Sequence, residues 1–147
     1  MTPPSTTPAL APGTCLFCAI GAGTVPASIV WRDDQICAFL DARPVFKGHV
    51  LVVPRPHTPT LADVPPAALG GLFATVQRVA RAVEQGLGAD GTFVAMNNKV
   101  SQSVPHLHVH VVPRRFKDGL RGFFWPRVRY ADDAERDDFA NRIRGGF

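Results

Sequence analysis

The sequence predicts an α+β fold, in which an antiparallel sheet packs with one long helix and a second helix lies at the C-terminus. Short runs rich in β-branched and aromatic residues stand before and after one long amphipathic stretch, an order typical of this class. The chain has 147 residues, 46% of them hydrophobic, which is enough for one domain with a proper core and too short for two.

The first predicted elements are a hairpin and a buried strand. Residues 28–31 and 35–40 have the composition of strands and flank the polar turn Arg32-Asp33-Asp34. Residues 49–53 form a more continuous apolar run between Gly48 and Pro54, which is typical of a strand buried on both faces.

One long helix is predicted to begin at Pro65-Pro66, because proline suits a first helical turn, and to end near residues 86–88. Its apolar residues recur at steps of three and four: Leu69, Leu72, Phe73, Val76, Val79, Ala80, Val83 and Leu87.

Two further strands, 92–96 and 106–112, are expected on either side of a polar loop at 97–103, and Pro113 closes the second strand. Residues 132–144 carry acids early and arginines late. This order complements the helix dipole and predicts a C-terminal helix.

The N-terminal stretch, residues 1–14, is rich in proline and small polar residues and predicts a disordered tail that precedes a domain over 15–147. It lacks the basic start and apolar run of a signal peptide, and no apolar segment approaches the length of a membrane span. We therefore expect a cytoplasmic protein without a membrane partner.

Charge is modest overall, at +4, but six basic residues and one acid lie between positions 114 and 129. This excess indicates a local attraction for phosphate, although a solvated basic face explains it equally well. It falls short of the footprint of a nucleic-acid-binding protein.

Histidines alternate with apolar residues at His106, His108 and His110. In a strand these three side chains would share one face, while Leu107 and Val109 pack behind them. A row of imidazoles can bind a metal, or a neutral imidazole can attack an electrophile such as phosphorus.

Cysteines are too few for a disulfide framework, and Cys15 and Cys18 have the spacing of a metal site or a redox pair. Two thiolates can supply half of a closed four-ligand zinc site. A pair of ordinary cysteines beside a strand explains the spacing equally well, and Cys37, among apolar residues, is interpreted as packing.

The segment His-Leu-His-Val-His-Val-Val resembles the signature of the histidine triad (HIT) superfamily of nucleotide-binding hydrolases and transferases. The resemblance extends over Cys15 to Ile20, Ala38 to Asp41, Lys47 to His57 and Gln102 to Pro105, hence from about residue 14 to 112. Residues from about 114 onward look like a C-terminal extension of a HIT-like domain.

Family resemblance implies a role for each matching residue. His108 resembles the nucleophile that takes the nucleotidyl group, and His110 and Ser103 resemble residues that assist at the phosphate. By resemblance to zinc-containing bacterial members, the zinc ligands would be Cys15, Cys18, His57 and His106. The nucleotide-binding residues implied are Leu16, Phe17, Ile20 and Phe39 against the base, Asp41 at the ribose, and Asn97 and Gln102 near the phosphate.

Several of these residues also have simpler interpretations. An apolar side chain at such positions is more often core than pocket, and Asp41 could start a turn before Pro44. His49 matches a histidine that we interpret as structural.

The resemblance implies an enzyme that cleaves a purine nucleotide conjugate at its α-phosphate, either a dinucleoside polyphosphate or a nucleoside phosphoramidate, through a nucleotidyl-histidine intermediate. Many members are homodimers, so we expect a homodimer. The alternative function is a zinc-stabilised nucleotide-binding sensor or partner-binding module with little turnover.

Overall fold

The computed structural model describes residues 14–121 and 127–147 and divides the chain into two compact units, one ending at Phe116 and one beginning at Lys117. The predicted tail, residues 1–14, lies outside these ranges except for Thr14. Within the two described ranges, no helix has the length and apolar character needed to cross a membrane.

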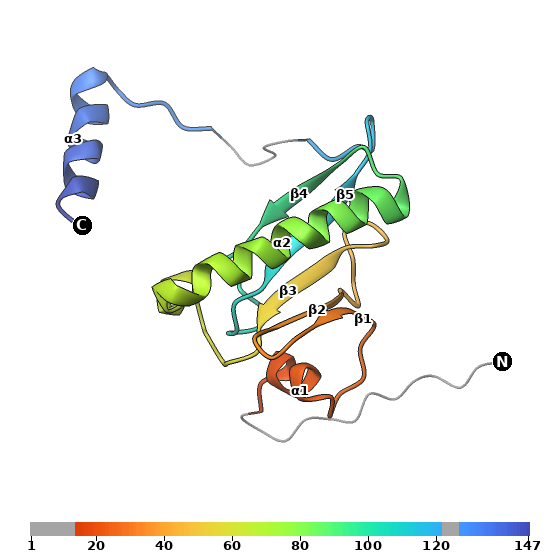
Figure 1. The fold of residues 1–147 in the computed structure, drawn as a ribbon. Coiled ribbons are helices and arrows are strands. Elements are labelled where there is room, and N and C mark those ends of the chain that lie inside the picture. The colour runs from red at the N-terminus through yellow and green to blue at the C-terminus, as the bar shows by residue number, and fades with distance from the viewer. Residues whose placement is uncertain (1–13, 122–126) are drawn as a thin grey trace. The chain divides into compact units, whose positions relative to one another are not determined.

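The first unit is built on a five-stranded antiparallel sheet with strand order β1-β2-β3-β5-β4 (Figure 1). This sheet, with the helices that accompany it, confirms the predicted α+β class. The predicted hairpin is also confirmed, because the first two strands pair with each other. The strands are β1 (Ile29–Arg32), β2 (Ile36–Leu40), β3 (Val50–Pro54), β4 (Gly91–Ala95) and β5 (Val109–Arg114).

The long helix α2 (Pro66–Leu87) crosses one face of the sheet (Figure 1), after a short 3-10 turn, η1 (Leu61–Asp63). Its bounds agree with the prediction: proline occupies the first turn, and Gly88 ends the helix with a left-handed φ of 62°. Leu72, Val76, Val79 and Val83 are buried against the sheet. The predicted apolar stripe is wider than the part of the helix surface that the sheet covers, since Phe73 remains 40% and Leu87 46% exposed.

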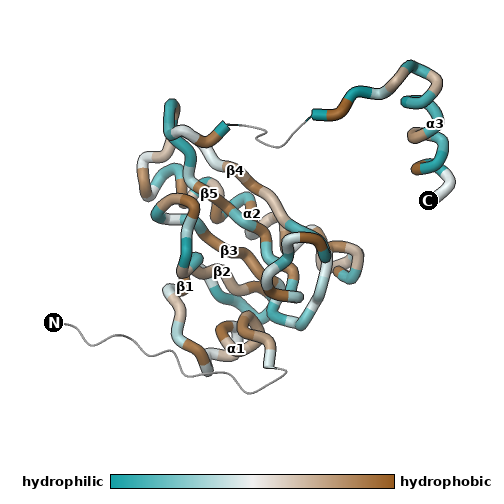
Figure 2. The backbone as a smooth tube through the Cα atoms, turned by 180° about the vertical axis from the view of Figure 1, so that it is seen from behind, coloured by the Kyte–Doolittle hydropathy of each residue, from teal (hydrophilic) through white to brown (hydrophobic). Residues whose placement is uncertain are grey.

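A short helix, α1 (Leu16–Ala22), covers the opposite face and was not predicted. Seven residues are too few to show helical periodicity, and a helix this short depends on tertiary packing. Phe17 and Ile20 supply that packing against Phe39 and Leu51 of the sheet. The strand between the two layers, β3, is hydrophobic along its length (Figure 2) because both of its faces are covered.

The last strand of the first unit begins later than predicted. The prediction placed a strand at 106–112, whereas β5 starts at Val109. The residues before it bond elsewhere, since the N–H of Leu107 donates to the Thr58 carbonyl, at 2.7 Å, and not to a neighbouring strand. The predicted alternation is nevertheless confirmed, because Leu107, Val109 and Val111 are fully buried on the α2 side.

The second unit contains α3 (Asp133–Arg144), which confirms the predicted C-terminal helix. Asp132 caps it by accepting a hydrogen bond from the Glu135 N–H, at 2.8 Å. Acids fill the first turn, and Arg142 and Arg144 fill the last.

Candidate functional site

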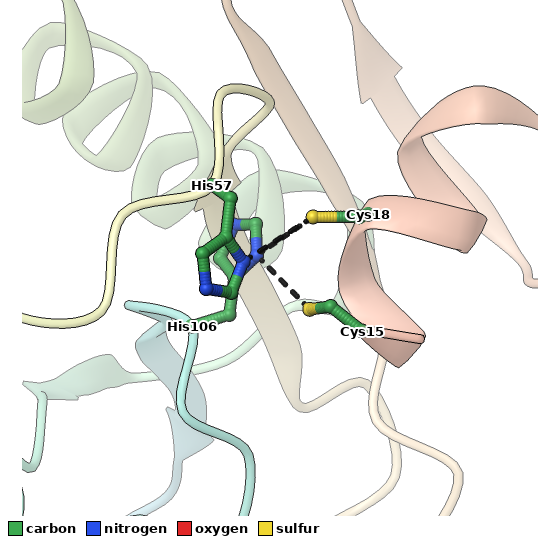
Figure 3. A group of neighbouring side chains, drawn as sticks. All are labelled: Cys15, Cys18, His57 and His106. Atoms are coloured by element: carbon green, nitrogen blue, oxygen red, sulfur yellow. Dashed lines mark hydrogen bonds between the residues drawn. The ribbon is translucent and has the colours of Figure 1, made fainter. Parts of the chain in front are cut away.

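Two cysteines and two histidines from three parts of the chain converge beside α1 (Figure 3). Cys15 is the N-cap of α1 and Cys18 lies in its first turn, His57 follows β3, and His106 precedes β5. Nδ1 of His106 lies 3.3 Å from Sγ of Cys15 and 3.5 Å from Sγ of Cys18, and Nδ1 of His57 lies 3.4 Å from Sγ of Cys18. The four donor atoms all lie within 4.8 Å of one another.

The ring of His106 is oriented as a metal ligand would be. Its Nε2 lies 2.7 Å from the Pro54 carbonyl oxygen, and because a carbonyl can only accept, Nε2 carries the proton and donates. The lone pair of the neutral ring is therefore on Nδ1, which faces both sulfur atoms. A ligand histidine whose other nitrogen is held by a backbone carbonyl is the usual arrangement at metal sites.

The pKa values of His106 and Cys18 are also those expected of a cluster that needs a bound cation. Burial lowers the pKa of His106, which favours the neutral ring that binds metals. Burial, together with the neighbouring Cys15 thiol, raises the pKa of Cys18 to about 11. Two thiol groups held together are costly to ionise without a positive charge between them, and two sulfur and two nitrogen donors are a donor set of structural zinc.

The next histidine, His108, presents a free nitrogen on the α1 side of the sheet. Its Nδ1 donates to the backbone carbonyl of His106 at 2.7 Å, so the lone pair of the neutral ring is on Nε2. The ring is 4% exposed, and the Phe17 ring contacts it edge-on with centroids 5.1 Å apart. A buried imidazole with a fixed tautomer and an available lone pair can act as a nucleophile.

The third histidine, His110, is the end of a hydrogen-bond chain. The N–H of Val45 donates to Nδ1 of His49 at 3.1 Å, so the neutral His49 ring carries its proton on Nε2. That Nε2–H donates to Nδ1 of His110 at 2.9 Å. The neutral His110 ring therefore carries its own proton on Nε2, where it can donate to an anion.

Electrostatics keep His110 uncharged. Burial, followed by the neighbouring rings of His108 and His49, lowers the pKa of His110 to about 4, against a smaller opposing effect of Asp41. Burial likewise lowers the pKa of His49. The chain from Val45 to His110 thus stays neutral near pH 7.

The carboxylate of Asp41 lies beside this chain of hydrogen bonds. Asp41 Oδ2 lies 3.7 Å from Nδ1 of His49, and Oδ1 accepts a hydrogen bond from the Arg43 N–H at 2.9 Å. Asp41, His49 and His110 also lie close enough to hold a metal. Since Nε2–H of His49 is directed at Nδ1 of His110, however, the hydrogen bond accounts for their proximity.

The residues predicted to contact the base lie near the histidines, mostly within the core. Phe17, Ile20 and Phe39 are 6%, 5% and 2% exposed, whereas Leu16 is half-buried at the edge of α1. The Phe17 ring lies 5.4 Å from that of Phe39 and 5.9 Å from that of His106. This aromatic ring therefore links the cysteine-histidine cluster to His108.

The predicted phosphate-side loop is braced by its own side chains. Gln102 donates to the Pro59 carbonyl at 2.6 Å and accepts from the Lys99 N–H at 2.9 Å, so both ends of its amide are engaged. Asn97 donates to the Ser101 carbonyl at 3.2 Å. Ser103 is exposed, and within the described part of the chain no hydrogen bond joins it to His108 or His110.

One contact of the site is not apparent from the sequence. The sequence predicts a structural role for His49, and in the fold this residue donates a hydrogen bond to His110. The register places Leu51 opposite His110, so His49, two residues away on the same face, is its diagonal neighbour. Only the pairing of β3 with β5 shows this relation, and that pairing is not visible in local sequence.

Comparison with known proteins identifies the family to which the chain is similar. The HIT domain family matches residues 22–117. An uncharacterized HIT-like protein of Mycobacterium tuberculosis, MT1300, is 45% identical over 108 residues, which cover 72% of this chain and 75% of that protein. The adenylylsulfatase HINT3 of Arabidopsis thaliana is 32% identical, over 72% of this chain and 55% of its own length. An asymmetrical bis(5'-nucleosyl)-tetraphosphatase of Schizosaccharomyces pombe is 34% identical, over 64% and 53%.

Solved structures give the same assignment. A HIT family protein from Bacillus subtilis superposes with a TM-score of 0.82 at 31% identity, covering 91% of this chain and 97% of that one. A zinc-bound histidine triad protein from Mycobacterium smegmatis superposes with a TM-score of 0.70 at 37% identity, covering 91% and 98%. With the family match over most of the chain, these likenesses show that the protein belongs to the HIT domain family.

Proposed function

We propose that the protein cleaves a purine nucleotide conjugate at its α-phosphate through a nucleotidyl intermediate on His108. The observation that carries the proposal is the hydrogen bond from Nδ1 of His108 to the His106 carbonyl, which leaves Nε2 unprotonated. Relatives that are an adenylylsulfatase and a bis(5'-nucleosyl)-tetraphosphatase support the substrate class.

The reaction has two steps. In the first, Nε2 of His108 forms a bond to the α-phosphorus while the bond from phosphorus to the leaving group breaks, and the leaving group departs with the electron pair and takes up a proton. In the second, water attacks the same phosphorus and displaces the imidazole, which releases a nucleoside monophosphate. In a transferase, another nucleophile replaces water.

Stabilisation of the phosphoryl oxygens is assigned to His110 and Ser103. The neutral His110 ring presents an Nε2–H, and a donor fixed before the reaction stabilises developing negative charge without reorganisation. Asp41 is proposed to bind the ribose hydroxyls. Leu16, Phe17, Ile20 and Phe39 are proposed to line the base site, with Asn97 and Gln102 shaping the adjoining loop.

A structural zinc ion is proposed at Cys15, Cys18, His57 and His106. Four ligands leave no open position, so the ion would fold the site and would not activate water. The zinc-bound relative from Mycobacterium smegmatis and the convergence of the four donors support this.

Trapping the intermediate tests the function. Diadenosine tetraphosphate, adenosine phosphoramidate and adenylyl sulfate would each be mixed with enzyme, quenched in a neutral denaturant and examined by mass spectrometry for a nucleotidyl adduct on His108. We expect His108→Ala to lose the adduct and at least about a thousandfold in turnover, while AMP affinity by calorimetry changes by less than about threefold.

The alternative function predicts a different outcome. A nucleotide-binding sensor would bind AMP with no adduct and with turnover unchanged by His108→Ala. Either an unmodified His108 or near-normal turnover of that variant would overturn the proposed mechanism.

A further inference from the structure

A cavity of about 680 Å³ opens on the α2 side of the sheet, between α2 and the hairpin of β1 and β2. Its walls are mostly apolar, and among the residues that form them are Trp31, Leu40, Val79, Val83 and Leu87. This volume lies within the range of about 300–1,000 Å³ that is typical of small-molecule sites.

The cavity and the catalytic histidines lie on opposite faces of the sheet. Leu40 and Val50 line the cavity, whereas their strand neighbours Phe39 and Leu51 pack on the α1 side. His110 pairs with Leu51, so its side chain also lies on the α1 side of the sheet. The cavity is therefore a separate site.

The charged side chains that line the cavity are all positive. Among the described residues, Lys47 and Arg78 are the ionisable ones in its lining, and none of the others there is acidic. The guanidinium carbon of Arg78 lies 4.1 Å from the centre of the Trp31 ring. Within the part of the chain that the structure describes, no carboxylate pairs with Lys47 or Arg78.

The apolar lining is incompletely covered. Leu40 is 39% and Leu87 46% exposed at this groove. At one end, Gly48 has a φ of 98°, and a β-carbon there would come within 2.4 Å of Leu87. The glycine thus lets Leu87 lie directly over the start of the strand and close that end.

We propose that this cavity binds a small anionic amphiphile, with its acyl chain along the apolar walls and its carboxylate attracted by the positive charges of Lys47 and Arg78. An apolar cavity whose described lining carries two cations and no acid is complementary to a molecule with an apolar body and one negative end. The ligand is taken up from solution as a free molecule.

Decanoate, used below its micelle concentration, is the probe. The sequence has one other tryptophan, so the Trp125→Phe protein reports on Trp31 alone by fluorescence. We expect a saturable change with decanoate and binding at least about fivefold weaker with decanol, which has the same chain but no charge. No saturable change, or equal affinity for both probes, would overturn the proposal.

Matched variants locate the site. Lys47→Gln combined with Arg78→Gln should weaken decanoate binding about fivefold to tenfold and leave decanol unaffected. Arg81→Gln removes an exposed arginine of the same helix that does not line the cavity, and it should have no effect.

Filling the cavity gives a second readout. Ala82→Phe places a ring in the groove from an exposed helix position, and it should abolish decanoate binding while AMP affinity and thermal stability are retained. Unchanged decanoate binding in this variant would contradict the assignment. Conversion of a homodimer to a monomer by Ala82→Phe would identify the groove as a subunit contact and would also overturn it.

Discussion

A histidine acquires its role in this protein from the partner of one ring nitrogen. The Pro54 carbonyl accepts a hydrogen bond from Nε2–H of His106, so the lone pair of Nδ1 faces the sulfur atoms. The His106 carbonyl does the reverse for His108, which leaves Nε2 free. Three histidines of one motif thus present different ring nitrogens: a lone pair toward two sulfur atoms, a lone pair beside Phe17 and an Nε2–H donor. The family motif implies different roles for them, but only the fold shows the hydrogen bonds that set each tautomer.

Substitution of His49 tests the chain that sets the tautomer of His110. His49→Asn keeps an acceptor for the Val45 N–H but has no group that reaches His110, whereas His49→Gln can place an amide N–H near the position of Nε2. We expect kcat to fall about tenfold in His49→Asn and to recover partly in His49→Gln, with little change in AMP affinity.

Nitrogen-15 NMR of His110 provides a readout that general destabilisation would not move. In the wild-type protein the proton should be on Nε2, and in His49→Asn the two tautomers should mix. Wild-type kinetics together with an unchanged His110 spectrum in His49→Asn would show that the chain has no role in positioning.

The low pKa of His110 predicts that the protein loses stability in mild acid. The folded-state pKa, about 4, lies below the value of about 6.5 in an unfolded chain, so the unfolded state binds more protons between these values. Stability is therefore full above pH 7 and declines as the pH falls toward 4. The contribution of this one group should reach about 2 kcal/mol at pH 5.

Urea unfolding of the wild-type protein and His110→Asn at pH 7 and pH 5 measures this contribution. The variant should lose less stability between the two pH values, because asparagine has no group that takes up a proton in this range. Any acid-induced release of metal affects both proteins alike and cancels in the comparison. Equal losses would show that His110 is protonated as easily in the folded state as in the unfolded chain.

At the scale of elements, local patterns predicted what local interactions stabilise. The proline start, the apolar period and Gly88 defined α2 to within a residue, and the acid-to-arginine order of residues 132–144 defined α3. Helix α1 could not be predicted from local pattern, because the conformation of its seven residues depends on contacts with β2 and β3.

In the site, too, some features could be predicted from the sequence and others depend on contacts between distant segments. The cysteine-histidine cluster was implied by the family motif and is assembled in the fold. The role of Gln102 depends on the Pro59 carbonyl, 43 residues earlier, so its bracing of the loop was not visible in the sequence. The hydrogen-bond partners of Gln102 and His49 both lie in distant segments of the chain, so these contacts could not be predicted from local sequence.

The cysteines at the start of α1 predict that metal holds this helix to the rest of the protein. Cys15→Ser should reduce bound zinc from about one ion per chain to near zero and should lower the free energy of unfolding by several kcal/mol, since binding to a structural site contributes directly to folding. Elemental analysis and urea unfolding measure the two effects.

Cys37→Ala is the matched control. Cys37 is fully buried in the core on the α1 side but is not a member of the cluster, so zinc content should be unchanged even if packing suffers. Protein that binds no zinc when prepared with the metal present would refute the site and return Cys15 and Cys18 to a packing role.

At the scale of the whole molecule, the sheet ends in β1 on one side and in β4 on the other. Among the described strands β4 pairs with β5 alone, and an edge strand is a surface on which a second chain can add. Val94 pairs with Val111, whose side chain packs on the α2 side. Val94 is 42% exposed, and on the same side Phe73 of α2 is 40% exposed.

We propose that two copies associate through this edge, as expected for a homodimer, and that a charge at Val94 prevents it. Val94→Lys places an ammonium group in the apolar contact, where burial without a partner is costly. In sedimentation velocity the wild-type protein should have about twice the chain mass of 15.9 kDa, and Val94→Lys should sediment as the single chain. Val100→Lys, the same change at a loop position that is 80% exposed, should remain dimeric. A wild-type monomer, or a Val94→Lys protein that still dimerises, would exclude this edge as the interface.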